Sequence, residues 1–295
     1  MEGIFEYRNE ENSVTIIKYI GNDTELVIPE TVEGKSVTSI GDYAFVNQRS
    51  IKMIEFPHGL QRIGSHAFYD CRGLSSVILS DSISDISDGA FKNCDDLHMV
   101  ELHLYEGALT SIKSILEEFG QEITLWLFYH HENHLQKTCL IFPRYLHNYV
   151  EFTQARIVNQ ETHGFGVHYR EHLLDSGIDY KGYDELFLLV SQVEEVELCC
   201  RIALARVLYP YQVSNHILPV YIQYLQAHIS TWMIKLLKDD DMETLRQLDT
   251  NNFYTKEVLT EALQLAHQMG KIEFATYFMT LNQVRVPRGE RKFEL

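Results

Sequence analysis

Three copies of one short motif follow one another at a fixed interval near the start of the chain. They are IGDYAF from Ile40, IGSHAF from Ile63 and ISDGAF from Ile86, so 23 residues separate each copy from the next. Apolar residues recur at the same interval beyond the motif, at Ile51, Leu74 and Leu97, at Ile54, Val77 and Val100, and at Phe56, Leu79 and Leu102. Repeats of this length are typical of solenoids, in which one unit buries its apolar face only against the next.

Each unit contains a segment with the spacing of a leucine-rich-repeat strand. LSSVIL is apolar at Leu74, Val77 and Leu79, and the alternation of an extended chain turns Val77 and Leu79 inward. Neighbouring units would pair these strands about 4.8 Å apart in a parallel sheet. The outward positions should then form two rows that we predict to bind a partner: Met53, Ser76 and Met99 in one, and Glu55, Ile78 and Glu101 in the other.

Other repeated positions suit structural roles. The expected interior residues are Phe45, Phe68 and Phe91, and the expected turn residues are Asn47, Asp70 and Asn93, whose short polar side chains favour turns. Cys71 and Cys94 are equivalent positions one unit apart, which leaves a disulfide, a metal site or two buried thiols open. We favour buried thiols, because free cysteine packs as a small hydrophobe.

These units resemble the BspA-like leucine-rich repeat. The resemblance is carried by IPETVEGKSVTSIGDYAF, GLQRIGSHAFYDCRGLSSVIL and SISDISDGAFKNCDDLHMVEL, and it covers roughly Ile16 to Leu102 with about three repeats. It implies a right-handed solenoid with a binding role, commonly adhesion or protein recognition, and no catalytic residues. Before the first unit, SVTIIKYI and ELVIP read as two strands joined at Gly21–Asp23, and we expect this hairpin to cap the solenoid.

Beyond Leu104 the interval is lost. The stretch ALTSIKSILEEFG predicts an amphipathic helix, and ITLWLFY and TCLIFP predict a strand hairpin that would end the solenoid by continuing its sheet. The following segment, up to about residue 185, is polar, aromatic and irregular in pattern. A segment found behind BspA-like repeats in other bacterial proteins is similar to FPRYL, ARI, HGFGVHYR, YDELF and RVLYPY taken together. This resemblance implies only a shared two-part design.

From Leu186 onward the pattern is helical. We expect one helix over ELFLLVSQVEEVELCCRIALARVLY, ending at Pro210, and another that starts near Pro219. EALQLAHQMGKIEFATYFMTLN resembles an ankyrin-type helix pair with Gly270 in its turn. The predicted class is therefore α+β, with repeats and their cap at 1–106, a mixed connector at 107–185 and an all-helical domain at 186–295.

Charge and composition narrow the range of functions. The formal net charge is −17, from 42 acidic and 25 basic residues, and it disfavours nucleic acid as a partner. No apolar run reaches the roughly 18 to 20 residues that span a bilayer, so we expect no membrane insertion. The first residues lack the pattern of a signal peptide and the five cysteines lack CxxC spacing, which predicts a cytoplasmic protein. A leader removed from the chain would instead place it at the extracellular surface.

Histidine-rich segments are the candidates for chemistry. HHENH at 130–134 lacks the HExxH spacing of a zinc protease, and we interpret it as a solvated loop with no metal site. HGFGVHYR offers His163, His168 and Arg170 to an anionic ligand or a partner, or else forms a rigid bend held by Phe165 and Tyr169. We expect Cys199 and Cys200 to be core residues, KDDDME to be an acidic helix start, and no cofactor to be bound.

Three functions remain open. The first is a non-catalytic scaffold that binds another protein through the repeat sheet and the helical domain. The second is an exported bacterial adhesin that binds a host or matrix protein. The third is an enzyme with its site near HGFGVHYR, which would require a closed polar pocket with a titrating histidine. The sequence leaves the identity of the partner and the oligomeric state open.

Overall fold

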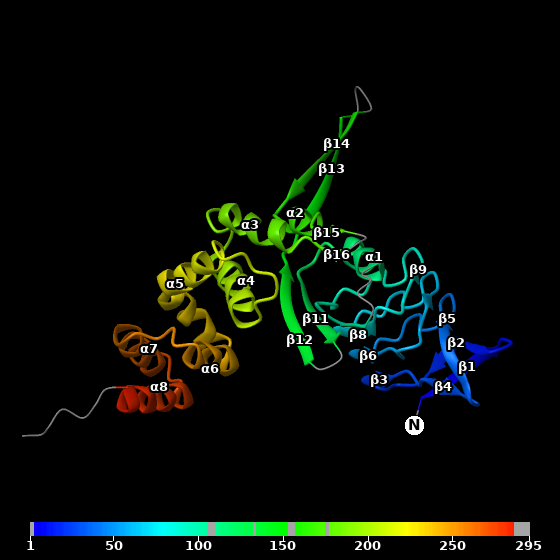
Figure 1. Ribbon diagram of the computed structural model, residues 1–295, viewed down its shortest axis with the longest axis horizontal. Helices are drawn as coiled ribbons and strands as arrows, with labels where there is room; N and C mark the ends of the chain where they lie inside the picture. The colour runs from blue at the N-terminus through cyan, green and yellow to red at the C-terminus, as the bar shows by residue number, and fades with distance from the viewer. Residues whose placement is uncertain (1–2, 106–109, 132–133, 153–156, 175–176, 286–295) are drawn as a thin grey trace, which may run out of the picture. The chain divides into compact units, whose positions relative to one another are not determined.

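The computed structural model describes residues 3–105, 110–131, 134–152, 157–174 and 177–285 (Figure 1). The chain divides into two compact units, Met1–Val190 with Leu208–Ser214, and Ser191–Val207 with Asn215–Leu295. A solenoid of about five turns with parallel strands forms the N-terminal region, and a helical region follows. The expected fold class is therefore confirmed. The finer division at residues 106 and 185 stays a prediction.

Two six-stranded sheets make up the solenoid and its extension in the described part of the chain. Sheet 1 has the order β1-β2-β5-β7-β9, with β4 beside β5: β1 Ile4–Asn9, β2 Ser13–Ile20, β4 Thr31–Val32, β5 Lys35–Ile40, β7 Arg62–Ile63 and β9 Asp85–Ile86. Sheet 2 has the order β12-β11-β10-β8-β6-β3: β3 Glu25–Val27, β6 Met53–Glu55, β8 Ser76–Ser80, β10 Met99–Leu104, β11 Ile123–His131 and β12 His134–Phe142.

Each 23-residue unit contributes one strand to each sheet. The alternation in LSSVIL identified the strands of sheet 2, whereas the second short strand of each unit, in sheet 1, was not predicted. Between the strands the coils are joined at equivalent positions, since Phe45 N donates to Ala67 O at 2.7 Å and Phe68 N donates to Ala90 O at 2.8 Å. Neighbouring units are therefore bonded to each other along the whole coil and not only through side chains.

The repeated phenylalanines form one aromatic stack inside the solenoid. Phe45 and Phe68 stack with ring centroids 4.8 Å apart, Phe68 and Phe91 stack at 5.1 Å, and all three are fully buried. Tyr19 of the cap extends the stack, with its ring 5.5 Å from Phe45. The expectation that these phenylalanines fill the interior is confirmed.

The turn that follows each sheet 1 strand has two residues in the left-handed conformation. Asn47, Asp70 and Asn93 have φ of 62°, 58° and 63°, which Asn and Asp tolerate better than most residues. Four positions earlier, Tyr43, His66 and Gly89 have φ of 57°, 54° and 66°. The predicted turn is therefore confirmed. Gly89 marks a second position in the left-handed conformation, which Tyr43 and His66 occupy in the other copies.

A hairpin caps the first unit, but it is not the predicted one. β1 and β2 pair antiparallel, and β2 continues sheet 1 through parallel pairing with β5. The segment ELVIP instead supplies β3, which pairs in parallel with β6 as the first strand of sheet 2. The expectation that SVTIIKYI and ELVIP form the hairpin was wrong, because the turn at Gly21–Asp23 leads from one sheet to the other.

The predicted helix and hairpin after Leu104 are confirmed at the other end of the solenoid. α1 spans Thr110–Glu118 and packs against β9, with Ile112, Ile115 and Leu116 buried. β11 pairs in parallel with β10 and antiparallel with β12, so the hairpin continues sheet 2.

The connector contains regular structure that its polar sequence did not indicate. β13 Leu146–Phe152 and β14 Ile157–His163 form an antiparallel hairpin, drawn as the long extended arm in Figure 1. β15 Leu173–Leu174 and β16 Gly177–Ile178 form a second, very short pair. The expectation of an irregular segment was wrong there, because IVNQETH is mostly polar and Asn148 interrupts the apolar alternation of LHNYVEF.

The helices of the connector and of the second unit follow in order. They are α2 Gly166–Arg170, α3 Tyr180–Val190, α4 Val196–Leu208, α5 Leu218–Lys238, α6 Met242–Thr250, α7 Lys256–Gln268 and α8 Ile272–Arg285. The single helix expected up to Tyr209 is two helices, because the chain turns at residues 191–195 without a Gly or Pro that would signal the break. Each described helix is too short or too polar to cross a membrane.

Helix ends in the second unit use the residues that the sequence marked. α5 packs against α6 and α7, and α7 packs against α8. Gly270, at φ 68°, ends α7 in a Schellman motif, in which Lys271 N donates to Ala266 O and Gly270 N to His267 O. Asp241 caps α6 by accepting from Thr244 N at 3.0 Å, so KDDDME is a helix start as predicted. The ankyrin-type resemblance of this region stays a prediction.

Candidate interaction surface

The outward side chains of sheet 2 form a surface that we name the repeat face. The strand register aligns Met53, Ser76 and Met99 in one row, and Glu55, Ile78 and Glu101 in the next. The inward residues between them are buried, with Ile54, Val77 and Val100 each at 0% exposure. The alignment of the two predicted rows is therefore confirmed, while their role in binding stays a prediction.

Exposure differs along the first row. Met99 is 37% exposed and Met53 is partly exposed, whereas Ser76 is only 8% exposed. Ser76 lies between the two methionines in the register, and its short side chain does not reach beyond theirs. Ser76 is thus a poor contact residue, and the prediction of an accessible serine was wrong. In the second row, Glu55, Ile78 and Glu101 are all partly exposed.

Aromatic residues continue the repeat face on β11. Thr124 pairs with Met99, Trp126 with Glu101 and Phe128 with His103, and all three β11 residues are partly exposed. Sequence reasoning missed Trp126, Phe128 and His103 as surface residues. The signal was present, since a hairpin that continues the sheet must also continue its alternation, and ITLWLFY places Trp126 and Phe128 in the outward phase.

A chain of polar contacts crosses this end of the face. His103 Nε2 lies 2.8 Å from Glu101 Oε1, and His103 Nδ1 lies 2.8 Å from His130 Nε2. The rings also stack, with centroids 4.9 Å apart for His103 and Phe128 and 4.3 Å apart for Tyr105 and His130. These contacts hold the rings in place, so the surface is ordered before any partner arrives.

Protonation of His130 is expected to destabilise this arrangement. Burial, and next the neighbouring rings of His103 and His58, lower the pKa of His130. The unfolded chain therefore takes up this proton near pH 6.5, at a higher pH than the folded chain, and the free energy of unfolding falls as the pH drops through that range. Urea titrations between pH 7.5 and 5 should show a smaller fall for His130→Asn than for the wild-type chain. Parallel pH profiles would contradict the assignment.

A lysine lies over the aromatic residues at the edge of the face. Lys137 Nζ is 5.8 Å from the ring centroid of Trp126 and 4.9 Å from that of Tyr209. The Trp126 and Tyr209 rings meet edge to face, with centroids 4.7 Å apart. The ammonium group of Lys137 thus already lies over the aromatic ring of Trp126, next to the second row.

A hollow of about 540 Å³ lies beside the exposed ring of Tyr105. It is lined by His58, Gln61, Ser80, Asp81, Ser82 and Tyr105. Tyr105 N donates to Asp81 Oδ2 at 2.8 Å, which fixes the backbone of Tyr105 at the rim of the hollow, and its ring is held by stacking on His130. The hollow borders the repeat face at Ser80, which pairs with His103 in the register of sheet 2.

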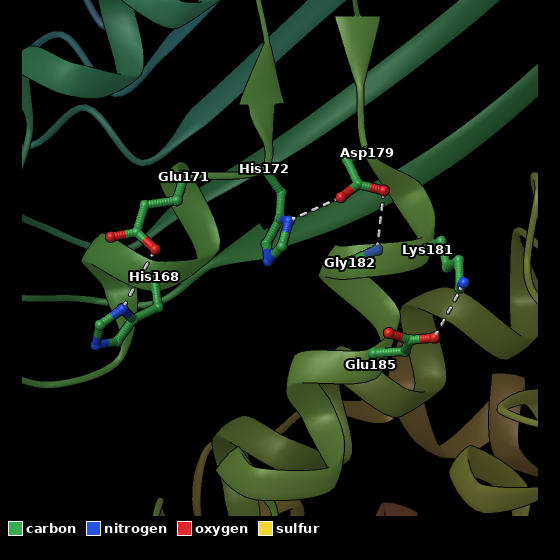
Figure 2. A network of polar contacts seen from close by, with 7 residues as sticks. All are labelled: His168, Glu171, His172, Asp179, Lys181, Gly182 and Glu185. Atoms are coloured by element: carbon green, nitrogen blue, oxygen red, sulfur yellow. Dashed lines mark hydrogen bonds and ion pairs between the residues drawn. The ribbon is translucent and has the colours of Figure 1, made fainter.

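The HGFGVHYR segment does not gather its three candidate residues into one site. His163 is exposed at the end of β14, and His168 is exposed on α2, where its Nδ1 lies 3.5 Å from Glu171 Oε2 (Figure 2). Arg170 is only 5% exposed. The short helix α2, with Tyr169 fully buried, matches the alternative of a rigid structural element.

Arg170 is bound by backbone carbonyls. Its Nε donates to Leu116 O at 2.9 Å and its Nη2 to Gln121 O at 2.8 Å. Its Nη1 donates to Pro143 O at 2.8 Å and to Gly166 O at 3.0 Å. Four of the five guanidinium N–H groups are therefore used, and the prediction that Arg170 contacts a ligand was wrong. Burial lowers the pKa of Arg170 to about 10, so the group is charged at neutral pH.

A histidine–carboxylate pair beyond this segment has a structural role. His172 Nδ1 lies 3.2 Å from Asp179 Oδ2, and Gly182 N donates to Asp179 Oδ1 at 3.0 Å (Figure 2). The Gly182 N–H and then His172 hold the pKa of Asp179 below its usual range. Asp179 therefore caps α3, and a larger residue at Gly182 would displace the Asp179 carboxylate or the His172 ring, because its Cβ would clash with both.

The pocket beside α2 differs from the one that an enzyme hypothesis requires. It has a volume of about 290 Å³, and its lining residues are Lys113, Tyr145, Val167, Arg170, Glu171, Leu173 and Leu174, without a histidine. No cluster of three or more metal-ligating side chains occurs among the described residues. His130 and His131 end β11 and His134 starts β12, so these three histidines lie in strands and not in the predicted loop. Residues 132 and 133 of HHENH lie outside the described ranges.

The cysteines are buried thiols. Cys71 Sγ donates to Phe45 O at 2.9 Å and Cys94 Sγ to Phe68 O at 3.3 Å, at equivalent positions of two units. Burial raises the pKa of Cys71 to about 12. Cys199 and Cys200 are also fully buried, as expected for core residues. These side chains serve packing.

Comparison with protein families identifies the class of the N-terminal region. Residues 18–120 match the BspA type leucine rich repeat region in six copies, and this part of the chain is a BspA-type leucine-rich-repeat solenoid. About three copies were expected. Glu25 precedes Met53 by 28 residues and Met99 precedes Thr124 by 25, so units with insertions fall outside the 23-residue interval. Leucine-rich-repeat proteins are in general interaction or surface proteins.

Solved structures of bacterial leucine-rich-repeat proteins are similar over part of the chain. A leucine rich cell surface protein from Faecalibacterium prausnitzii A2-165 is 27% identical over 33% of this chain and 35% of its own, with a TM-score of 0.28. A protein from Bacteroides capillosus is 29% identical over 33% and 76%, with a TM-score of 0.31. This chain spans about a third of the F. prausnitzii protein. No curated protein matches it.

Proposed function

We propose that the chain is a non-catalytic interaction module that binds another protein through the repeat face. The observation that supports this most is the composition of the face. Methionine, isoleucine, tryptophan and phenylalanine side chains lie partly exposed across neighbouring strands, at Met53, Ile78, Met99, Trp126 and Phe128. Protein interfaces are enriched in aromatic residues and methionine, and flexible methionine adapts to an irregular partner.

Two further points support a rigid binding platform. The inward residues of sheet 2 are buried and its strands are fixed by parallel pairing, so binding orders little backbone. Glu101 and the stacked rings of His103, Phe128, Tyr105 and His130 are likewise fixed before binding. Pre-organised surfaces of this kind lose less entropy when a partner binds.

Replacing Met53 and Met99 with glutamate should abolish capture of the partner. The change places two charges on the apolar part of the face, and both positions are exposed enough that the fold should stay within about 0.5 kcal/mol. The measurement is affinity purification from the native cell with quantitative mass spectrometry. A matched variant, Ile4→Glu with Ile17→Glu, adds the same charge to exposed positions of the cap.

Proteins retained by the wild-type chain and by the cap variant, but lost from the Met53 and Met99 variant, would be partners of the repeat face. Equal capture by all three chains would contradict the proposal. Fractionation of the same cells tests the location of the chain, which stays a prediction. Fractionation that finds the chain in the cytoplasm favours an internal scaffold, and recovery from the cell surface favours an adhesin.

A further inference from the structure

The second row of the repeat face alternates acidic and apolar side chains. Glu55, Ile78 and Glu101 lie in register on β6, β8 and β10. Adjacent strands lie about 4.8 Å apart, so the two glutamate positions are about 9.6 Å apart with Ile78 midway between them. This spacing defines what a partner must present: two groups that attract carboxylates, separated by an apolar one.

The two carboxylates are available to a partner. The carboxylate of Glu55 makes no hydrogen bond or ion pair with the described residues; the one hydrogen bond outside the sheet pairing, from Ile28 N at 2.9 Å, goes to its backbone carbonyl. Glu101 contacts one histidine, through the 2.8 Å distance between its Oε1 and His103 Nε2. Its side chain is 29% exposed. Both carboxylates therefore retain acceptor capacity that faces outward beside Ile78.

The end of the same row shows that a cation is accommodated on this face. Trp126 is the next residue in the register after Glu101, and Lys137 Nζ lies over its ring. Cation–π contacts of this kind are favourable even at exposed sites. The repeat face thus combines carboxylates with aromatic rings, the two groups that bind lysine and arginine most readily in proteins.

We propose that the repeat face binds a basic helical segment of the partner protein, with one Lys or Arg at Glu55, a second at Glu101 and an apolar side chain on Ile78. Residues i and i+7 of a helix lie about 10.5 Å apart along its axis, close to the 9.6 Å between the glutamate positions, and residue i+3 or i+4 falls between them. The net charge of −17 attracts such a segment at long range. This inference rests on the proposed function and specifies the chemistry of its partner.

The test uses the full chain and a defined probe. The probe is a fluorescein-labelled, alanine-rich peptide of 15 residues with Arg at positions i and i+7 and Leu at i+3 and i+4. Fluorescence anisotropy at 50 mM salt, where exposed charges are weakly screened, gives its Kd. We expect the Arg peptide to bind, and the same peptide with Glu in place of Arg to bind at least tenfold more weakly.

Matched variants separate the effect of the second row on the Kd from the effect of the net charge of the chain. Glu55→Gln with Glu101→Gln should raise the Kd of the Arg peptide at least tenfold. Glu6→Gln with Glu11→Gln removes two exposed carboxylates from the cap, brings the net charge to the same −15 from −17, and should change the Kd less than twofold. Equal weakening by both pairs, equal binding of the Glu peptide, or no binding of the Arg peptide would each overturn the inference.

The two proposals fail in different ways. If Met53→Glu with Met99→Glu abolishes capture of the partner while Glu55→Gln with Glu101→Gln leaves that capture unchanged, the repeat face binds a partner whose segment is not basic. If both pairs leave capture unchanged, the proposed function itself is contradicted.

Discussion

Replacing Phe68 with alanine is expected to lower the free energy of unfolding of the first compact unit, which contains the solenoid, by about 3–5 kcal/mol. Phe68 is fully buried in the middle of the aromatic stack, with rings on both sides at 4.8 Å and 5.1 Å. The neighbouring rings cannot close the cavity, because Phe45 N and Phe68 N are bonded to the adjacent coils and fix the spacing of the backbone. The cost therefore includes both the lost apolar burial and an unfilled cavity.

Urea denaturation followed by tryptophan fluorescence measures this effect. The chain has two tryptophans, and Trp126 lies on β11 of the first unit, whereas Trp232 lies on α5 of the second. In a Trp232→Phe background the fluorescence of Trp126 reports the unfolding of the first compact unit alone. Phe68→Leu is the matched control, expected to cost about 1–2 kcal/mol because it keeps most of the apolar volume. A loss below about 1 kcal/mol for the alanine variant would contradict a central role for the stack.

The repeated positions were predictable because each one faces the same surroundings in every unit. Phe45, Phe68 and Phe91 meet one another in successive coils, so a 23-residue interval in sequence is also a contact in space. The units with insertions were not recognised as repeats, because their spacing differs from the 23-residue interval. β3 and β11 make the same parallel pairs as the other strands, but the connection that follows β3 and the one that precedes β11 are longer than those between the other units.

The candidate surface was predictable in part. Row alignment follows from the repeat alone, which is why Met53, Met99, Glu55 and Glu101 lie as expected. Accessibility does not follow from alternation, since the exposure of Ser76 depends on the length of the side chains beside it. The aromatic extension at Trp126 required the additional step of carrying the alternation into the hairpin.

Arg170 shows the limit of interpretation by residue type. Arginine beside two glycines and two histidines is a common composition for anion binding, and the sequence carries no sign of the four carbonyls that the guanidinium contacts. Those carbonyls come from α1, from the loop between α1 and β11, from the residue after β12 and from α2 itself. Their convergence is a property of the tertiary fold.

Replacing Arg170 with methionine should therefore destabilise the first unit by more than about 3 kcal/mol. The substitution keeps an apolar side chain of similar length but removes four hydrogen bonds from a charged donor, each worth about 1.5–3 kcal/mol, and leaves their carbonyl acceptors without a partner in a buried site. Arg170→Lys should recover little, since an ammonium group has three donors and cannot reproduce the planar geometry of the guanidinium.

The same Trp126 fluorescence assay measures the effect, with Arg144→Met as the matched control. Arg144 is exposed, so its replacement should change the free energy of unfolding by no more than about 0.5 kcal/mol. A ligand-binding role for Arg170 predicts the opposite pattern, in which Arg170→Met keeps full stability because only a surface contact is lost. Equal stability of the two methionine variants would thus return Arg170 to the candidate ligand residues, and a large difference would establish it as the group that ties α1, α2 and the hairpin together.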